Sequence, residues 1–249
     1  WESLRDKPTP VTDVKGALIG EKIYVPGGLT ADGTPTDILE IYDPRTDAWE
    51  VGASLPKAVS AYALADFEGQ LYLFGGWDGE TEQNVVFIYN PQDNEWINGK
   101  QMLTKRSYVD SIVVSNSIFV VGGWDGRKGL ATNEVYLPSR DYNNENPWSV
   151  AASLPESKFG SVIQGIGEII FLITKSKEDA LQIFQYYPQE DEWQISTSDL
   201  HLLIYQRSAS TTLQGFIYLL GGETENSKIL DKAYRYQALY LIMLPSVGK

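Results

Sequence analysis

The segment Gly75-Gly-Trp-Asp-Gly79 occurs again, residue for residue, as Gly122-Gly-Trp-Asp-Gly126, 47 positions later. Further glycine pairs stand at Gly27-Gly28 and Gly221-Gly222. A tryptophan repeats with a similar interval, at Trp49, Trp96, Trp148 and Trp193. The interval of 99 residues before the last glycine pair is twice the others, so it holds one copy without glycines, which the tryptophan spacing places at Thr174-Lys175. The sequence therefore contains five copies of a unit of about 50 residues.

Each copy has the pattern of four short β-strands. In the second copy these are residues 60–66, 70–74, 85–89 and 95–98, separated by turn-forming residues. No stretch of useful length shows helical periodicity. Four-stranded units repeated around an axis form a propeller. We therefore predict an all-β fold, a five-bladed β-propeller of four-stranded antiparallel sheets.

A tyrosine stands seven positions before three of the tryptophans and is followed by a turn, as in Tyr42-Asp-Pro44 before Trp49 and Tyr89-Asn-Pro91 before Trp96. In the third copy an insertion around residues 139–144 lengthens this turn. Glycine pair, tyrosine and tryptophan in this register resemble kelch repeats over essentially the whole chain. Two departures from that pattern are the missing glycines of the fourth copy and the missing tryptophan of the fifth.

The chain is predicted to be one domain, residues 1–249. The blades are expected at about 11–52, 58–99, 106–151, 158–196 and 206–237, followed by an extension, 238–249. Because the fifth copy supplies three strands, we expect residues 1–5 to pair into the C-terminal blade as its outer strand and so close the ring. A sixth blade outside this sequence is the alternative.

The composition excludes several classes of function. The chain has 33 acidic and 20 basic side chains, for a formal charge of −13, which argues against nucleic acids and anionic membranes as partners. It has no cysteine and one histidine, His201, which we expect in a solvated loop, so thiolate and multi-histidine metal sites are ruled out and no cofactor is expected. The apolar run 238–244 is too short to span a membrane.

The start at Trp1, without an initiator methionine or a leader, indicates a part of a longer protein. The compartment is left open, with the extracytoplasmic part of a larger protein as one expectation.

Two of the seven tryptophans, Trp77 and Trp124, are not needed by the repeat, and each is followed by an aspartate, Asp78 or Asp125. The resemblance to kelch substrate adaptors implies that the aromatic residue of this loop lies on the ligand-binding face. The alternative is that each ring packs on its own blade.

The resemblance also implies basic residues near the start of each innermost strand. The residues at or near that position here are Arg106, Ser107, Lys158, Arg207 and Ser208. Cations gathered at one mouth of the central channel would suit a carboxylate-bearing partner. Alternatively, they pair with nearby acids such as Asp78 or Asp125 and order the loops.

The leading hypothesis is a non-catalytic binding domain, a monomeric sensor or interaction domain of a larger protein that recognises a protein, a peptide or a small polar ligand. Kelch copper oxidases depend on a cysteine and on histidine ligands, whereas this chain has no cysteine and a single histidine. The alternative is a carbohydrate-handling enzyme, a sugar epimerase or glycosidase-like propeller. Convergence of Asp110, Glu168 and basic residues in a deep pocket would favour the enzyme.

Overall fold

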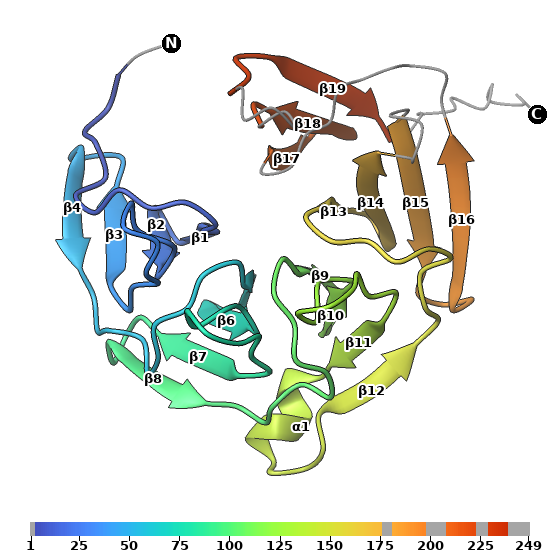
Figure 1. Cartoon of the computed structure of the whole chain (residues 1–249), viewed down its shortest axis with the longest axis horizontal. Helices are drawn as coiled ribbons and strands as arrows, with labels where there is room; N and C mark the ends of the chain where they lie inside the picture. The colour runs from blue at the N-terminus through green and yellow to red at the C-terminus, as the bar shows by residue number, and fades with distance from the viewer. Residues whose placement is uncertain (1–2, 176–180, 198–207, 223–228, 239–249) are drawn as a thin grey trace, which may run out of the picture.

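The computed structural model describes residues 3–175, 181–197, 208–222 and 229–238. Five antiparallel sheets are arranged around a central axis, with the first strand of each sheet nearest the centre (Figure 1). The prediction of an all-β, five-bladed propeller is confirmed.

The first blade consists of β1 (Ala17–Ile19), β2 (Lys22–Pro26), β3 (Leu39–Asp43) and β4 (Ala48–Val51). The second contains β5 (Ala63–Phe67), β6 (Gln70–Phe74), β7 (Val86–Asn90) and β8 (Glu95–Asn98). The third contains β9 (Asp110–Val114), β10 (Ser117–Val121), β11 (Asn133–Tyr136) and β12 (Trp148–Ala151), with the short helix α1 (Pro138–Tyr142) in the predicted insertion. The fourth contains β13 (Val162–Ile166), β14 (Ile169–Lys175), β15 (Leu181–Tyr187) and β16 (Glu192–Thr197). The fifth contains β17 (Ala209–Leu213), β18 (Phe216–Leu220) and β19 (Ala233–Gln237).

The core of the molecule lies between the blades. Four apolar clusters fill the spaces between successive sheets, from the first and second to the fourth and fifth. Between the second and third blades, for example, Phe74, Tyr136 and Trp148 are all buried, with the Phe74 and Trp148 rings edge to face at 5.9 Å. Aromatic pairs in this geometry stabilise beyond their area of contact.

The repeated tyrosine and tryptophan tie neighbouring blades together through one set of hydrogen bonds, here called the interblade clamp. In the second blade, Asn94 Oδ1 accepts hydrogen bonds from the hydroxyl of Tyr89 (2.7 Å) and from the amide of Ala53 in the first blade (2.8 Å). The indole of Trp96 donates to the carbonyl of the same Ala53 (2.9 Å). The same hydrogen bonds recur in three other clamps, in each of which the tyrosine is bonded to the aspartate. In these, Arg5 is bound by Asp47 and Trp49 with Tyr42 as the tyrosine, Lys100 by Asp141 and Trp148 with Tyr136, and Ala152 by Asp191 and Trp193 with Tyr186.

The glycine pairs are explained by the close approach of the next blade. A Cβ on Gly75 would lie 2.5 Å from the carbonyl oxygen of Arg106, and Gly75 has φ +66°. The amide of the following Gly76 donates to that same oxygen at 2.9 Å. A side chain at Gly75 would therefore displace the backbone of the neighbouring blade.

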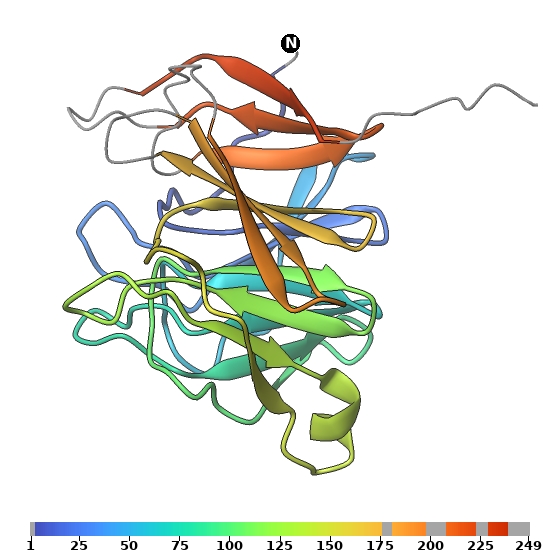
Figure 2. The same ribbon diagram turned by 90° about the vertical axis from the view of Figure 1, so that its right-hand side faces the viewer.

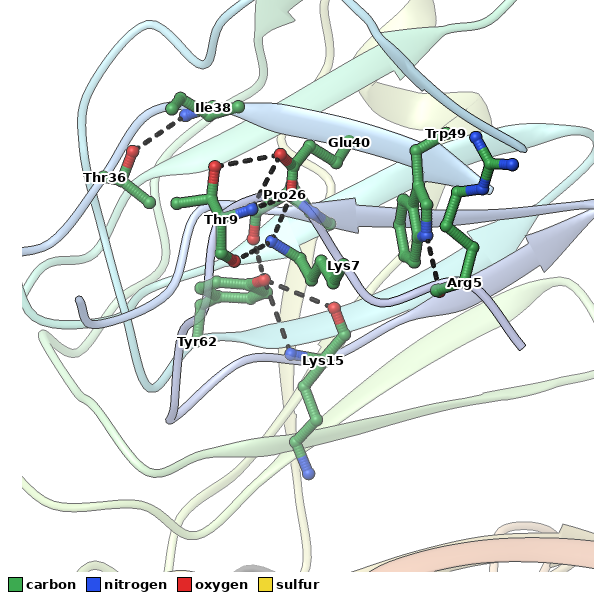
Figure 3. Close-up of polar contacts among 10 residues, drawn as sticks. All are labelled: Arg5, Lys7, Thr9, Lys15, Pro26, Thr36, Ile38, Glu40, Trp49 and Tyr62. Carbon is green, nitrogen blue, oxygen red and sulfur yellow. Dashed lines mark hydrogen bonds and ion pairs between the residues drawn. The ribbon is translucent and has the colours of Figure 1, made fainter. Parts of the chain in front are cut away.

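The described N-terminal residues contact the first blade. Ser3 to Arg5 belong to no strand. The Arg5 amide donates to Asp47, and the Arg5 carbonyl accepts from the indole of Trp49, as Figure 3 shows for the second contact. The fifth sheet has three strands among the described residues, rather than the predicted four. The expected pairing of residues 1–5 with that sheet is therefore not present for residues 3–5, while Trp1 and Glu2 lie outside the described residues. Lys7 and Thr9 bind the buried carboxylate of Glu40, which fixes this segment on the first blade (Figure 3).

None of the helices in the described ranges has the length and apolar character needed to cross a membrane.

Candidate functional site

The innermost strands of the five blades surround a central cavity of about 590 Å³. Its walls come from segments 12–16, 61–64, 108–112, 160–164 and 208–210, one from each blade. This volume is within the range of small-ligand sites in proteins. The long loops that follow the second strands, 27–38, 75–85 and 122–132, project at one end of the channel, called here the loop face (Figure 2).

On the loop face, a series of main-chain hydrogen bonds, called here the mouth ring, joins four of the five blades around the opening of the channel. The amide of Ala61 donates to the carbonyl of Asp13 (2.7 Å), Tyr108 donates to Ala61 (2.7 Å), and Gly160 donates to Tyr108 (3.1 Å). All four residues have positive φ, between +47° and +60°. Since non-glycine residues adopt this conformation at a cost, the surrounding packing holds it in place.

Below the mouth ring, an ion pair joins the first and third blades. Lys15 Nζ lies 2.9 Å from Asp110 Oδ1, 95 positions away, and the two residues occupy equivalent positions, each two residues after a member of the mouth ring. The carboxyl of Asp110 is buried and the side chain of Lys15 is 47% exposed. Figure 3 shows the Lys15 side chain pointing away from the polar cluster of the first blade. Burial raises the pKa of Asp110, and Lys15 opposes this rise.

Aromatic residues lie beside the mouth on the loop face. The rings of Trp124 and Phe159 are 5.1 Å apart and tilted by 57°. Phe159 is 42% exposed and Tyr108, a member of the mouth ring, is 40% exposed. Trp124 is half-buried, so it packs against the next blade and still contributes to the surface.

The loops that carry Trp77 and Trp124 are anchored beside the mouth. Trp77 exchanges two backbone hydrogen bonds with Ser60 (2.8 and 3.0 Å), and Trp124 does the same with Ser107 (2.8 and 2.9 Å). Ser60 and Ser107 directly precede the mouth-ring residues of their blades. Both tryptophans therefore lie at the mouth end of the channel, and the packing alternative holds in part, since Trp124 contacts Phe159.

The two aspartates of these loops order the turns. Asp78 Oδ1 accepts hydrogen bonds from the amides of Glu80 and Thr81, and its other oxygen lies 2.5 Å from Lys57 Nζ. Burial acts to raise the pKa of Asp78, but Lys57 and the two amides outweigh it and hold the pKa at about 2.

Asp125 accepts from the amides of Arg127 and Lys128, whose hydrogen bonds lower its pKa. Arg106 and Lys158 do not pair with either aspartate; the cation on Asp78 is Lys57.

Arg106 is a structural residue, and its expected place at the channel mouth is wrong. Its side chain is 0% exposed, forms an ion pair with Glu134, and donates to the carbonyl of Gly122 (3.0 Å). The guanidinium is drawn inward because the buried Glu134 and the carbonyls at the glycine pair provide acceptors there. Ser107 is likewise buried.

Lys158 is also turned away from the channel. Its ammonium contacts Gln182 (2.9 Å), Glu156 (3.2 Å) and the ring of Phe184. Ser208 lines the channel and donates to the carbonyl of Gly221 (3.2 Å). Arg207 and His201 lie outside the described residues. Arg106 and Lys158 therefore do not form the predicted gathering of cations, and neither of them supports a carboxylate-bearing partner.

The acidic residues proposed for acid–base chemistry are not brought together. Asp110 lines the channel, whereas Glu168 lies in the turn between β13 and β14 and is bonded to Gln189 outside the channel. Within the described ranges, no group of three or more His, Cys, Asp or Glu side chains is arranged to hold a metal ion.

Sequence reasoning missed Lys15, Tyr108 and Phe159. A usable signal existed for two of them, because Tyr108 and Lys15 can be located by counting 47 or 48 positions from equivalent residues of neighbouring copies. Phe159 gave no signal beyond its place next to Lys158.

Comparison with known proteins shows where this architecture recurs. Residues 11–56, 62–103 and 105–155, together more than half of the chain, match the family model described as Kelch motif. The chain is 30% identical over 84 residues to Beta-scruin of Limulus polyphemus (34% of this chain, 9% of that protein). It is 32% identical over 84 residues to an F-box/kelch-repeat protein of Arabidopsis thaliana (34% and 22%), and 28% identical over 76 residues to Kelch-like protein 35 of Mus musculus (30% and 13%). These matches span less than a quarter of the relatives' own lengths.

The solved structure of YjhT has the same fold. It superposes with a TM-score of 0.72 and 18% sequence identity, covering 88% of this chain and 75% of that chain. At this identity the likeness concerns the arrangement of the blades alone.

Proposed function

The chain belongs to the kelch-repeat family, and we propose that it is a non-catalytic binding domain that recognises a protein or peptide partner at its loop face. The domain would serve as the sensor or interaction part of a longer protein. Two relatives, an F-box/kelch-repeat protein and a kelch repeat and BTB domain-containing protein, carry kelch repeats together with other domains in their names, which fits this role.

The observation that carries the proposal is the pair of exposed aromatic rings beside the mouth, Tyr108 and Phe159. Aromatic side chains are enriched at the centres of protein interfaces, because they bury a large area at a low entropic cost. Their backbone is rigid here, since Tyr108 is held in the mouth ring and Phe159 packs on Trp124. A preformed aromatic surface loses less entropy on binding than a mobile one.

The proposal is tested by selecting peptides from a displayed library on the immobilised chain and measuring their affinities by fluorescence polarisation. We expect Tyr108→Asn and Phe159→Ser each to weaken the selected peptides at least tenfold. Asparagine is chosen at Tyr108 because it tolerates positive φ. The matched control is Tyr142→Asn, since Tyr142 is 92% exposed but lies in α1 at the outer rim (Figure 1).

Peptides that bind the Tyr108 and Phe159 variants as tightly as the unchanged chain would overturn the proposal. Failure to select any peptide above background would also count against it.

A further inference from the structure

Among the described residues that line the channel, the charged groups are mainly acidic. Among the described lining residues, these groups are the carboxylates of Asp13 and Asp110 and the ammonium of Lys15. The chain as a whole carries a formal charge of −13. The charge of the described lining groups and the overall charge are both negative, and a negative charge attracts a cation rather than the carboxylate that the sequence suggested.

The buried carboxylate of Asp110 accepts fewer hydrogen bonds than its two oxygens allow. Asp110 is 5% exposed, and Lys15 is its one ion-pair and hydrogen-bond partner in the described part of the chain. A carboxylate has two oxygens and about four acceptor positions, and a buried charge is costly unless it is paired. The side chain of Lys15 is 47% exposed, and its ammonium lies at the end of a flexible stem. Lys15 can therefore move into solvent when another cation binds to Asp110.

A second observation also points to a ligand in the channel. Ser161, which lines the same cavity from the fourth blade, is 7% exposed, and its hydroxyl has no partner among the described residues. Buried hydroxyls are almost always hydrogen-bonded in folded proteins. An unpaired hydroxyl and an under-paired carboxylate in one cavity of about 590 Å³ are groups that a polar ligand would satisfy.

We propose that the channel binds an ammonium or guanidinium group, which pairs with Asp110 in place of Lys15. The proposed source of this group is a lysine or arginine side chain of the protein or peptide partner. In this respect the inference rests on the proposed function. Asp110 lies two residues beyond Tyr108, no more than about 7 Å along the chain. A long basic side chain that enters through the mouth ring would reach it while the partner's backbone stays on the aromatic surface.

The binding experiment titrates three small probes into the whole chain and measures the affinity of each probe from the chemical-shift changes that it causes in NMR spectra. The probes are the α-amides of Nα-acetyl-lysine, of Nα-acetyl-norleucine, which lacks the ammonium, and of Nα-acetyl-glutamate, whose side chain carries the opposite charge. We expect the lysine amide to bind at least tenfold more tightly than either control. Affinity should fall with added salt, because the interaction is between charges.

Two variants locate the site. Asp110→Asn should abolish the preference for the lysine amide, and Lys15→Met should strengthen its binding, because methionine keeps most of the stem and removes the competing ammonium. The second variant retains the carboxylate, so it tests the proposal even if Asp110→Asn does not fold. Equal binding of lysine and norleucine amides, tighter binding of the glutamate amide, or an unchanged affinity in Lys15→Met would each overturn the inference.

The same experiments separate this inference from the proposed function. Selected peptides that depend on Tyr108 and Phe159 but show no need for a basic residue would overturn the cation site and leave the loop-face proposal intact. Binding of the lysine amide with no peptide selected on the loop face would have the opposite meaning.

Discussion

The indole Nε1 of Trp49 donates a hydrogen bond to the carbonyl oxygen of Arg5 at 3.1 Å, across 44 positions of the chain. Arg5 thereby takes the place in the first blade's clamp that Ala53, Lys100 and Ala152 take in the next three. Those three residues each lie four positions after a repeat tryptophan, and Arg5 lies four positions after Trp1. This offset places Trp1 in the register of the repeat tryptophans. Ser3 to Arg5 form no strand, and the closure of the ring through the N-terminus stays a prediction.

The clamp tryptophans should differ in their effect on stability according to their burial. Trp96 is buried between the first two blades, whereas Trp49 is half-buried. Trp96→Ala should lower the free energy of unfolding by about 3–5 kcal/mol, and Trp49→Ala by clearly less. Trp96→Phe, which keeps a ring and loses the bond to Ala53, should cost about 1 kcal/mol from the hydrogen bond alone. Urea unfolding followed by circular dichroism measures all three; an equal loss in Trp49→Ala and Trp96→Ala would contradict this expectation.

Arg106 should act on folding through Glu134. Arg106→Met leaves the buried Glu134 carboxylate without its cation and should cost about 3–5 kcal/mol. Adding Glu134→Gln removes the uncompensated charge and keeps an acceptor for the amide of Leu103, so the double variant should be more stable than Arg106→Met. A double-mutant cycle in urea checks this; strictly additive losses would show that the two side chains are not coupled.

Asp78 should make the protein more stable at neutral pH than in acid. Its folded-state pKa of about 2 lies below the ordinary value of 3.8, so its contribution is present above pH 3.8 and is lost as the pH falls towards 2. Asp78→Asn should therefore lower the melting temperature at pH 7 and have little effect near pH 2. Asp125→Asn is the matched control, because Asp125 accepts the same kind of two amide hydrogen bonds but, within the described part of the chain, has no ion pair like that between Asp78 and Lys57. A constant gap between Asp78→Asn and the unchanged chain from pH 7 to pH 2 would refute the assignment.

Asp110 should have the opposite dependence. Burial raises its pKa, so the folded state holds the proton more tightly than the unfolded state, and stability falls as the pH rises from 3.8 through the folded-state pKa. Asp110→Asn should raise the melting temperature at pH 7, and this gain should shrink as the pH approaches 3.8. Thermal melts of both proteins across this range test the sign; a variant less stable at pH 7 would show that the Lys15 pair outweighs the cost of burial. A charge that lowers stability is often retained for function.

The fold could be predicted because its signals are local and repeated. The glycine pair, the tyrosine and the tryptophan recur in one register, and the predicted strands of the second copy agree with β5 to β8 within a few residues. The largest difference is at Ser60, predicted as the start of a strand, which forms an isolated bridge with Trp77 because the chain turns at Ala61, where φ is +53°.

The site was less predictable from the sequence, because it depends on the direction in which each side chain points in the folded protein. The position of Arg106 is correctly placed near the start of an innermost strand, but its direction is set by Glu134, 28 residues later on β11. Likewise, Lys15 and Asp110 are 95 residues apart, and nothing in either local sequence indicates that they meet. Such contacts follow from the packing of blades and not from the pattern within one blade.

The mouth ring is built from main-chain atoms, so its hydrogen bonds do not depend on which side chains project from it. Asp13, Ala61, Tyr108 and Gly160 differ in charge, size and polarity, yet they take the same backbone conformation. Substitutions at these four positions therefore change the side chains around the mouth and leave the main-chain hydrogen bonds in place, so this rim is where a new binding specificity can arise, by evolution or by design.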